Sequence, residues 1–188
     1  MPSGIEQSYK VWCFRGMAGH GQEGVTMLEL MITLAIVAIL AALAAPSFSN
    51  FVADVRQSSM MGELSSDIHL ARSESIKRNA RVLICPLGAG STCGNGTNWA
   101  VGWVVCYDVD EDGLCDAPVG NDANPVKVHV ALTGPVTLTG PDAPLYFRAV
   151  GTASTLASFV LTSTSGGTGV ATRVTTVTPA GSVTTIKQ

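Results

Sequence analysis

Two features near the N-terminus are suited to chemistry: a glycine at a potential cut site and a lone carboxylate. Glu29 is the single charged residue between Gly24 and Ala53. A charge at the head of an apolar run is costly in lipid, so it indicates a functional site. Gly24 follows a short polar leader, which indicates cleavage there. Together these residues predict a membrane-delivered subunit that is processed on the cytoplasmic side and then packed into an assembly.

An acidic segment further along the chain has the spacing of a cation-binding loop. Its residues form the pattern D-x-D-x-D-G, the first half of a calcium loop: Asp108, Asp110, Asp112 and Gly113. The twelfth position is Val119 instead of a bidentate glutamate, so an EF-hand is not expected. Asp116 or Asp122 would complete a non-standard calcium site. The favoured alternative is an acidic turn closed by a disulfide, with no cofactor.

The cysteines indicate disulfide bonds. Cys13 lies in the leader, and four more follow it: Cys85, Cys93, Cys106 and Cys115. An even number in an exported domain indicates a disulfide framework, here with three possible pairings, and the spacings fit no common zinc pattern. We favour the pairing of sequence neighbours, Cys85 with Cys93 and Cys106 with Cys115. Each would contribute roughly 2–4 kcal/mol by constraining the unfolded chain. Free buried thiols are the alternative.

One long helix, from residue 25 to about residue 80, is expected to position the N-terminal features. Its first part, residues 25–53, is apolar on all sides, as is typical of a transmembrane and assembly segment. From Phe51 to about Asn79, apolar residues recur at spacings of mostly three to five, which predicts an amphipathic half that packs on a soluble domain. This stripe consists of Phe51, Val55, Met60, Leu64, Ile68, Ala71 and Ile76.

From residue 81 onward the pattern predicts β-strands. Short segments rich in Val, Thr and aromatic residues alternate with Gly, Pro, Asn and Asp. The fold class is therefore α+β, a long N-terminal helix packed on an antiparallel β-sheet head. The last two strands would form a hairpin around Pro179-Ala180-Gly181. The expected strands are 81–85, 100–107, 126–132, 145–150, 158–164, 171–178 and 182–186.

The tryptophans and histidines of the head are expected to be structural. Trp99 and Trp103 are four residues apart, which would place them on one face of a strand. We expect both in the core and not on a ligand-stacking surface. Neither His69 nor His129 has the neighbours of a catalytic triad in the sequence.

Length and charge limit the class of protein. With 188 residues the chain has room for one membrane helix and one soluble domain, and we divide it into a leader (1–24), a membrane helix (25–53) and a head (54–188). The net charge of −3 argues against a generally basic nucleic-acid binder. Either Met1 or Met17 is the true start, and the latter leaves a leader of eight residues.

The stretch Gly24-Val25-Thr26-Met27-Leu28-Glu29-Leu30 resembles the class III signal of type IV pilins and type II secretion pseudopilins. The resemblance implies that a peptidase cuts between Gly24 and Val25 and methylates Val25. Glu29 then holds the fifth mature position, where it would pair with the freed amine of its own or a neighbouring subunit. An ordinary secretory signal cut near Ala45 is the alternative.

Motifs in the head make the resemblance more specific. They are ARSESIKRN (71–79), VLIC (82–85), WAVGWVV (99–105) and Asp108. They look like the GspH/FimT family of minor pilins and pseudopilins, over a match from Gly24 to about Gly113 with a weaker echo at Pro179-Ala180-Gly181.

The resemblance implies a structural role and no enzymatic activity. The expected function is that of a minor pilin that assembles or primes a type IV pilus, with a type II secretion pseudopilin as the alternative. The implied partners are other pilins or pseudopilins, the prepilin peptidase, the inner-membrane assembly platform and membrane lipid. The chain would cross the bacterial inner membrane once, carry a periplasmic head, and enter a pilus or pseudopilus.

Two rival functions belong to other classes. Some members of the family are associated with DNA uptake through a Gly-Arg-x-Arg motif. Here the corresponding residues are Gly181-Ser182-Val183-Thr184, which lack both arginines, and phosphate binding needs several cations. A membrane-tethered periplasmic enzyme would need a nucleophile or a metal cluster in the head, and the sequence indicates neither.

Overall fold

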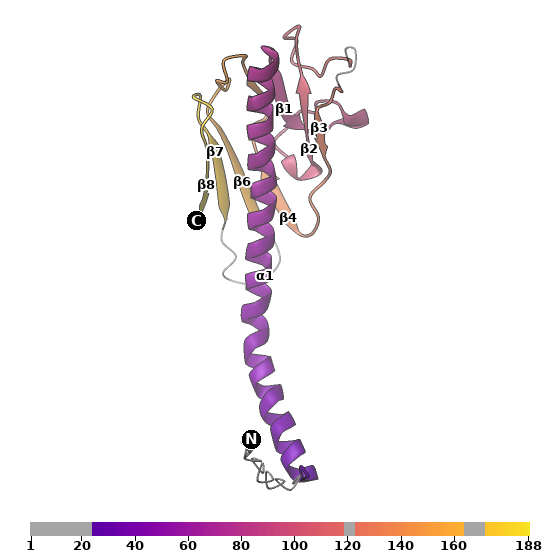
Figure 1. Ribbon diagram of the computed structural model, residues 1–188, viewed down its shortest axis with the longest axis vertical. Coiled ribbons are helices and arrows are strands. Elements are labelled where there is room, and N and C mark those ends of the chain that lie inside the picture. The colour runs from indigo at the N-terminus through magenta and orange to yellow at the C-terminus, as the bar shows by residue number, and fades with distance from the viewer. Residues whose placement is uncertain (1–23, 119–122, 164–171) are drawn as a thin grey trace, which may run out of the picture. The chain divides into compact units, whose positions relative to one another are not determined.

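The computed structural model describes residues 24–118, 123–163 and 172–188. The leader before Gly24 and the candidate ligand Asp122 therefore lie outside the described residues. The chain divides into two compact units, Met1–Ala42 and Leu43–Gln188. The helix α1, Met27–Arg78, has residues in both units, and the strands belong to the second (Figure 1).

Both ends of α1 have local sequence causes. At the N-terminus the Thr26 hydroxyl accepts a hydrogen bond from the backbone N–H of Glu29 at 3.2 Å, as a helix-capping residue does. At the C-terminus Asn79 adopts a left-handed conformation with φ of 51°, and the N–H of Ala80 donates to the carbonyl of Ser75. Asparagine tolerates this conformation better than most residues, so it ends the helix here.

In the first unit, α1 carries large apolar side chains that are exposed all around the helix. They are Met27, Leu28, Leu30, Met31, Ile32, Leu34, Ile36, Val37, Ile39 and Leu40. Over the described residues, no helix combines the length and the apolarity that crossing a membrane requires.

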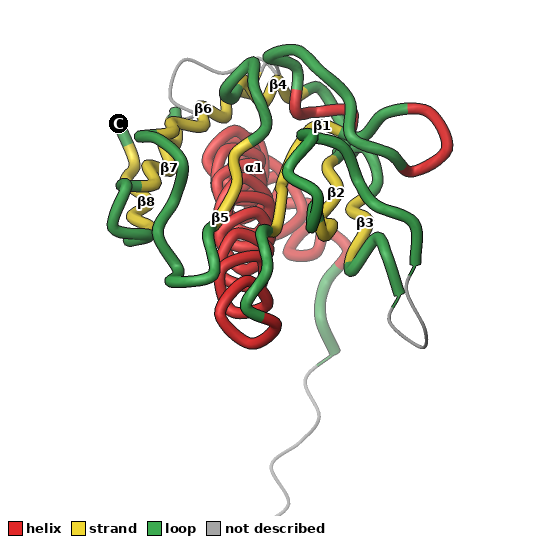
Figure 2. The backbone as a smooth tube through the Cα atoms, turned by 90° about the horizontal axis from the view of Figure 1, so that it is seen from above, coloured by secondary structure: helices red, strands yellow, loops and turns green. Residues whose placement is uncertain are grey.

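The second unit contains two four-stranded antiparallel sheets. The first has the order β3-β2-β1-β5 and the second the order β4-β6-β7-β8. Figure 2 shows the strands arranged around α1. The strands are β1 Val82–Pro86, β2 Trp103–Tyr107, β3 Lys127–His129, β4 Val136–Thr139, β5 Leu145–Phe147, β6 Ala157–Ser163, β7 Arg173–Val177 and β8 Val183–Lys187.

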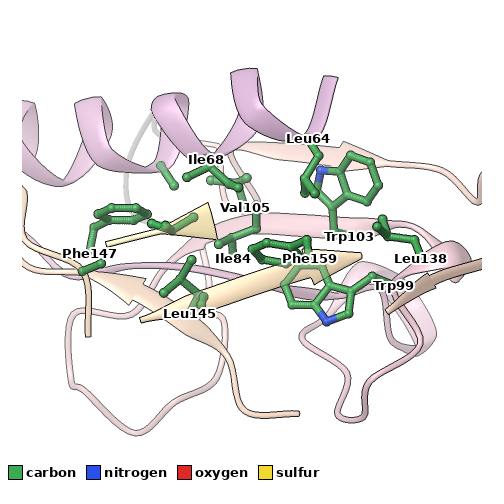
Figure 3. Packing of buried hydrophobic residues seen from close by; sticks show 14 of the residues in the cluster. Leu64, Ile68, Ile84, Trp99, Trp103, Val105, Leu138, Leu145, Phe147 and Phe159 are labelled. Carbon is green, nitrogen blue, oxygen red and sulfur yellow. The ribbon is translucent and has the colours of Figure 1, made fainter. Parts of the chain in front are cut away.

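The main core lies between α1 and the sheets (Figure 3). Leu64, Ile68 and Ala71 are fully buried, and their spacing of four and three places them on one face of α1. Trp99 packs edge-to-face against Phe159, with ring centroids 4.8 Å apart. This geometry is a favourable one for aromatic pairs. The amphipathic half therefore packs on the head, and the α+β class is confirmed. The predicted stripe is wrong at both ends, because Phe51, Val55 and Ile76 are exposed.

The central strands β1 and β2 are buried on both faces. On one face Ile84 and Val105 join the main core, and on the other Leu83 and Val104 join a smaller cluster that contains cysteines. Every residue of both strands is buried, which explains their continuous apolar sequences.

Four strand predictions need correction. The expected strands 126–132 and 145–150 end early, at His129 and Phe147. The expected strand 100–107 begins only at Trp103, because Trp99–Val101 forms a 3₁₀ helix, η2. Trp99 and Trp103 are both fully buried, as expected, but they belong to different elements. Gly102 separates these elements with φ of 99°, and a Cβ there would lie 2.2 Å from the carbonyl oxygen of His129. The strand Val136–Thr139 was not predicted at all.

The C-terminal hairpin has the turn that the sequence predicts. Gly181 has φ of 77°, and the N–H of Thr178 donates to the carbonyl of Ser182 at 2.9 Å. The guanidinium of Arg72 donates to the carbonyl of Gly181 at 2.8 Å. A Cβ on Gly181 would lie 2.5 Å from the Gly151 carbonyl oxygen. Arg72 thus joins the turn to α1, with no room for a side chain between them.

We expect Gly181→Ala to lower the free energy of unfolding by at least about 2 kcal/mol, because it adds a backbone clash to left-handed strain. Gly90→Ala is the matched control. Its φ is 68° and nothing lies within 4 Å of the added Cβ, so it isolates the strain, about 1 kcal/mol. Thermal unfolding of the full chain, followed by circular dichroism, measures both. Equal losses in the two variants would contradict the packed turn.

Candidate functional site

The residues of the predicted cut site lie just before α1 and are exposed. Gly24, Val25 and Thr26 have no regular secondary structure, and no heavy atom lies within 4 Å of a Cβ built on Gly24. The Val25 residue is 70% exposed. Among the described residues, a peptidase would meet an open backbone at the Gly24–Val25 bond.

Glu29 lies in the first turn of α1 and is exposed. In the described part of the chain, its carboxylate makes no hydrogen bond or ion pair; the backbone N–H alone donates, to Thr26. An acid in a first helical turn is favoured by the helix dipole. The helix dipole therefore stabilises the charge of Glu29 at this position. Since it has no partner among the described residues, this carboxylate is available to a group outside the chain.

Two carboxylates on α1 connect the helix to the first sheet. The buried Asp67 accepts a hydrogen bond from the indole N–H of Trp103 at 2.9 Å. It also forms an ion pair with the ammonium group of Lys127 at 2.5 Å. One turn earlier, Glu63 lies 2.9 Å from Nε2 of His129, whose ring stacks on Trp103 with centroids 3.8 Å apart. These contacts hold β2 and β3 against the helix.

Two further carboxylates bind strands from near the two ends of the part of α1 that lies in the second unit. Near its start, Asp54 binds Arg173 at 2.9 Å and Lys187 at 3.0 Å, from β7 and β8. Near its end, Glu74 accepts a hydrogen bond from the Tyr107 hydroxyl at 2.6 Å. Neither Asp54 nor Glu74 belongs to the apolar stripe that the sequence analysis singled out. It missed that they select partners on the strands, because partners so distant in sequence leave no local signal.

Both disulfides join sequence neighbours. Cys85 of β1 bonds to Cys93, and Cys106 of β2 bonds to Cys115. Each therefore ties a following loop back to a central strand. The bonds lie in the smaller cluster, on the face of the sheet away from the main core.

The acidic turn follows β2 and differs in detail from the predicted calcium site. Carboxylate oxygens of Asp108, Asp110 and Asp116 lie within 4.8 Å of one another and could hold a metal ion. The carboxylate of Asp112 is not in this group; it accepts from the Leu114 N–H at 2.8 Å.

Asp108 already has protein partners. Arg81 forms an ion pair with it at 2.6 Å, and the N–H of Gly113 donates to it at 3.2 Å. Burial raises the pKa of the Asp108 carboxyl, and the Arg81 guanidinium opposes this rise. These contacts are those of an acidic turn that closes on itself, and calcium binding stays a prediction.

Two protein-family models match this chain. The family model described as Type II transport protein GspH matches residues 61–181, more than half of the chain. The chain belongs to the GspH family. The model of the prokaryotic N-terminal methylation motif matches residues 19–45, which include Gly24, Val25 and Glu29.

Individual relatives of this GspH-family chain include pilus and secretion proteins. Fimbrial protein Q of Moraxella bovis is 38% identical over 47 residues, 25% of this chain and 30% of that protein. The chain thus spans less than a third of this curated relative.

Two solved structures are similar to this GspH-family chain. The type IV minor pilin FimU of Pseudomonas aeruginosa has 21% identity, covers 68% of this chain and 85% of its own, and has a TM-score of 0.48. The minor pseudopilin EpsH of Vibrio cholerae has 10% identity, covers 69% of this chain and 95% of its own, and has a TM-score of 0.50. At this identity the likeness to EpsH concerns the fold alone.

These findings show that the chain belongs to the GspH family, carries the N-terminal methylation motif and has a fold similar to that of EpsH. The family is structural and not enzymatic, and its members are membrane-anchored and exported.

We expect acid to weaken the attachment of the helix end to β2 through Glu74. The hydroxyl of Tyr107 and the cations of Arg78 and Lys77 hold the pKa of Glu74 below its ordinary value of 4.5. A lowered pKa in the folded state stabilises the fold above pH 4.5, and this stabilisation is lost as the pH falls through the folded value. Glu74→Gln should therefore lower the melting temperature more at pH 7 than near pH 3.

Glu111→Gln is the matched control for this prediction. The Glu111 side chain is 71% exposed and lies 3.7 Å from Arg81, so its removal should have little effect at either pH. A Glu74→Gln loss of equal size at both pH values would contradict the role given to its charge.

Proposed function

We propose that this chain is a minor pilin that assembles in, or primes, a type IV pilus. The precursor is cut after Gly24, methylated at Val25 and held in the bacterial inner membrane by residues 25–53, with a periplasmic head. The observation that carries the proposal is the carboxylate of Glu29. It is exposed and unpaired among the described residues, in a helix end that is otherwise apolar.

Cleavage supplies the partner that Glu29 lacks. Hydrolysis of the Gly24–Val25 bond creates an amine four residues before Glu29, on the same chain and on every neighbouring mature chain. In lipid an amine and a carboxylate each carry a large desolvation cost, which a close ion pair offsets. An incoming subunit is then stabilised only at the register where the two charges meet.

The attachment of the helix to the head supports a mechanical role. Asp54, Glu63, Asp67 and Glu74 each bond to a strand, over most of the helical half that lies in the second unit. Displacing the helix from the head would expose these charges and the main core together. A filament subunit needs such an attachment, because its helix and its head must move as one body during assembly.

The arrangement of the head supports neither rival function. Arg173 and Lys187, the cations near the C-terminal hairpin, both bind Asp54, so their charge is not available to a phosphate backbone. The ring nitrogens of His129 face Glu63 and the carbonyl of Val130, and not a hydroxyl or thiol. His69 is exposed on α1.

A pseudopilin of a type II secretion system is the second candidate, and the description of the matching family model favours it. Deletion of the gene in its host separates the two machines. Loss of surface pili with normal protein secretion supports the pilus, and loss of secretion with normal pili supports the pseudopilus.

We expect Glu29→Ala to leave export and cleavage intact and to reduce incorporation of the chain into filaments, because the amine of Val25 loses its partner. The measurement compares the chain in sheared filaments with the chain in membranes, by immunoblotting. Glu29→Asp keeps the charge and is the matched control. Normal incorporation of Glu29→Ala would refute the pairing.

We expect Gly24→Val to leave the precursor uncut, since a branched side chain blocks the extended backbone from a tight peptidase site. Intact-mass spectrometry of the membrane-extracted chain measures this. The wild type should begin at Val25 and carry one methyl group, whereas the variant should retain its leader. A mature mass for the variant would rule out cleavage at this bond.

A further inference from the structure

The two disulfides lie side by side on one face of the first sheet. Cys85 of β1 and Cys106 of β2 are both members of the smaller cluster, and their partners Cys93 and Cys115 pack against it. In the register of the two strands, Cys106 lies opposite Leu83, two residues from Cys85. The Sγ atoms of Cys85, Cys106 and Cys115 lie within 4.8 Å of one another. One sulfur of the first disulfide is therefore close to both sulfurs of the second.

The four sulfurs differ in their access to solvent. The strand residues Cys85 and Cys106 are fully buried, whereas the loop residues Cys93 and Cys115 are half-buried. A thiolate attacks a disulfide at a sulfur that it can reach, and the other sulfur leaves as a thiolate. Attack by an external thiol at Cys93 therefore releases the Cys85 thiolate inside the cluster, next to the second disulfide.

Backbone hydrogen bonds hold both loops in place independently of the disulfides. The residue after each loop cysteine donates to the central strand that its disulfide joins. The N–H of Gly94 donates to the carbonyl of Pro86 in β1 at 2.7 Å, and the N–H of Asp116 donates to that of Tyr107 in β2 at 3.0 Å. When one disulfide opens, the cysteines therefore stay close together. Groups held at short range in one molecule react much faster than separate molecules do.

From this geometry we infer that the two disulfides form one exchange system, in which a thiol that modifies one loop cysteine releases the other. The external thiolate forms a bond to Sγ of Cys93, and the Cys85–Cys93 bond breaks with its electron pair on Cys85. The Cys85 thiolate then forms a bond to Sγ of Cys106. The Cys106–Cys115 bond breaks, and Cys115 leaves as a thiolate that takes up the proton lost by the external thiol.

The exchange changes which loop is tied down. Two disulfide bonds are present before and after it, so it consumes no oxidant or reductant. The product carries a mixed disulfide at Cys93, a Cys85–Cys106 bond between neighbouring strands and a free thiol at Cys115. The acidic turn, which Cys115 ties to β2, has then lost its covalent attachment. Attack at Cys115 starts the same reaction in the opposite direction and frees Cys93.

A Cys93→Ser variant of the full chain tests the exchange directly, because it leaves Cys85 without its own partner. The folded variant is alkylated with iodoacetamide at neutral pH, and the modified residue and the remaining disulfide are mapped by mass spectrometry without reduction. We expect most of the label on Cys115, together with a Cys85–Cys106 disulfide. A label on Cys85 alone, or alkylation only after unfolding, would overturn the inference.

Cys115→Ser is the matched variant, since it leaves Cys106 beside the intact Cys85–Cys93 bond. Exchange predicts that the label moves to Cys93 and that the same Cys85–Cys106 disulfide forms. Circular dichroism of each variant shows whether it is folded before alkylation. A label that stays on Cys106 would contradict the exchange.

The wild-type chain provides a measurement that does not depend on the folding of a variant. The native chain is treated briefly with glutathione as the external thiol, and free thiols are then trapped with iodoacetamide. We expect glutathione on one loop cysteine and the trapped thiol on the other, in the same molecule. Glutathione on Cys93 together with a trapped thiol on Cys85 would show two independent disulfides and would overturn the inference. The outcome concerns the head alone, so it leaves the proposed function untouched.

Discussion

The position of the helix in the head depends on one buried carboxylate. Asp67 lies on the face of α1 that enters the core, and an unpaired charge there would be strongly destabilising. The indole N–H of Trp103 and the ammonium group of Lys127 supply its partners from two adjacent strands. Both partners are in place only when β2 and β3 hold one register and the helix has one rotation about its axis. Apolar contacts are not directional, so they would not select that rotation by themselves.

Gly102 shows how the backbone accommodates this arrangement. It allows the chain to leave η2 and enter β2 while its Cα lies close to the carbonyl of His129. The ring of His129 then reaches the face of Trp103 and the carboxylate of Glu63. A residue without a side chain thus brings β3 close enough for Lys127 to approach Asp67 and for His129 to cover the indole.

The sequence predicts the parts of the molecule that depend on local patterns. The apolar run with Glu29, the 3.6-residue periodicity of Leu64, Ile68 and Ala71, and the turn at Gly181 are all local signals, and the structure contains the corresponding elements. The strand β4 was missed although its residues alternate between apolar and polar, because four residues are too short a run to stand out in the sequence. Pairing to the longer β6 stabilises it, and that pairing is not visible in a local window.

The candidate site also contains residues that local sequence predicts and partners that it does not. The cut site and Glu29 follow from composition along a few residues. Arg173 lies 119 residues from Asp54, and Lys127 lies 60 residues from Asp67, so nothing in the local sequence specifies these partners. Gln57 shows the same limit. A glutamine on an amphipathic helix is ordinary, and only the fold shows that its side chain is buried.

The C-terminal hairpin is fastened to α1 at both ends. Arg72 holds the turn at Gly181, and Asp54 holds Arg173 and Lys187 at the open end. These two helix positions are separated by about 27 Å at the usual rise per residue. In Figure 1, β7 and β8 run along this stretch of the helix. A pull along the helix between these two positions is therefore shared by the backbones of both strands, because the two strands are held at the same two ends. The hairpin acts as a splint that makes the head resistant to tension along its own helix.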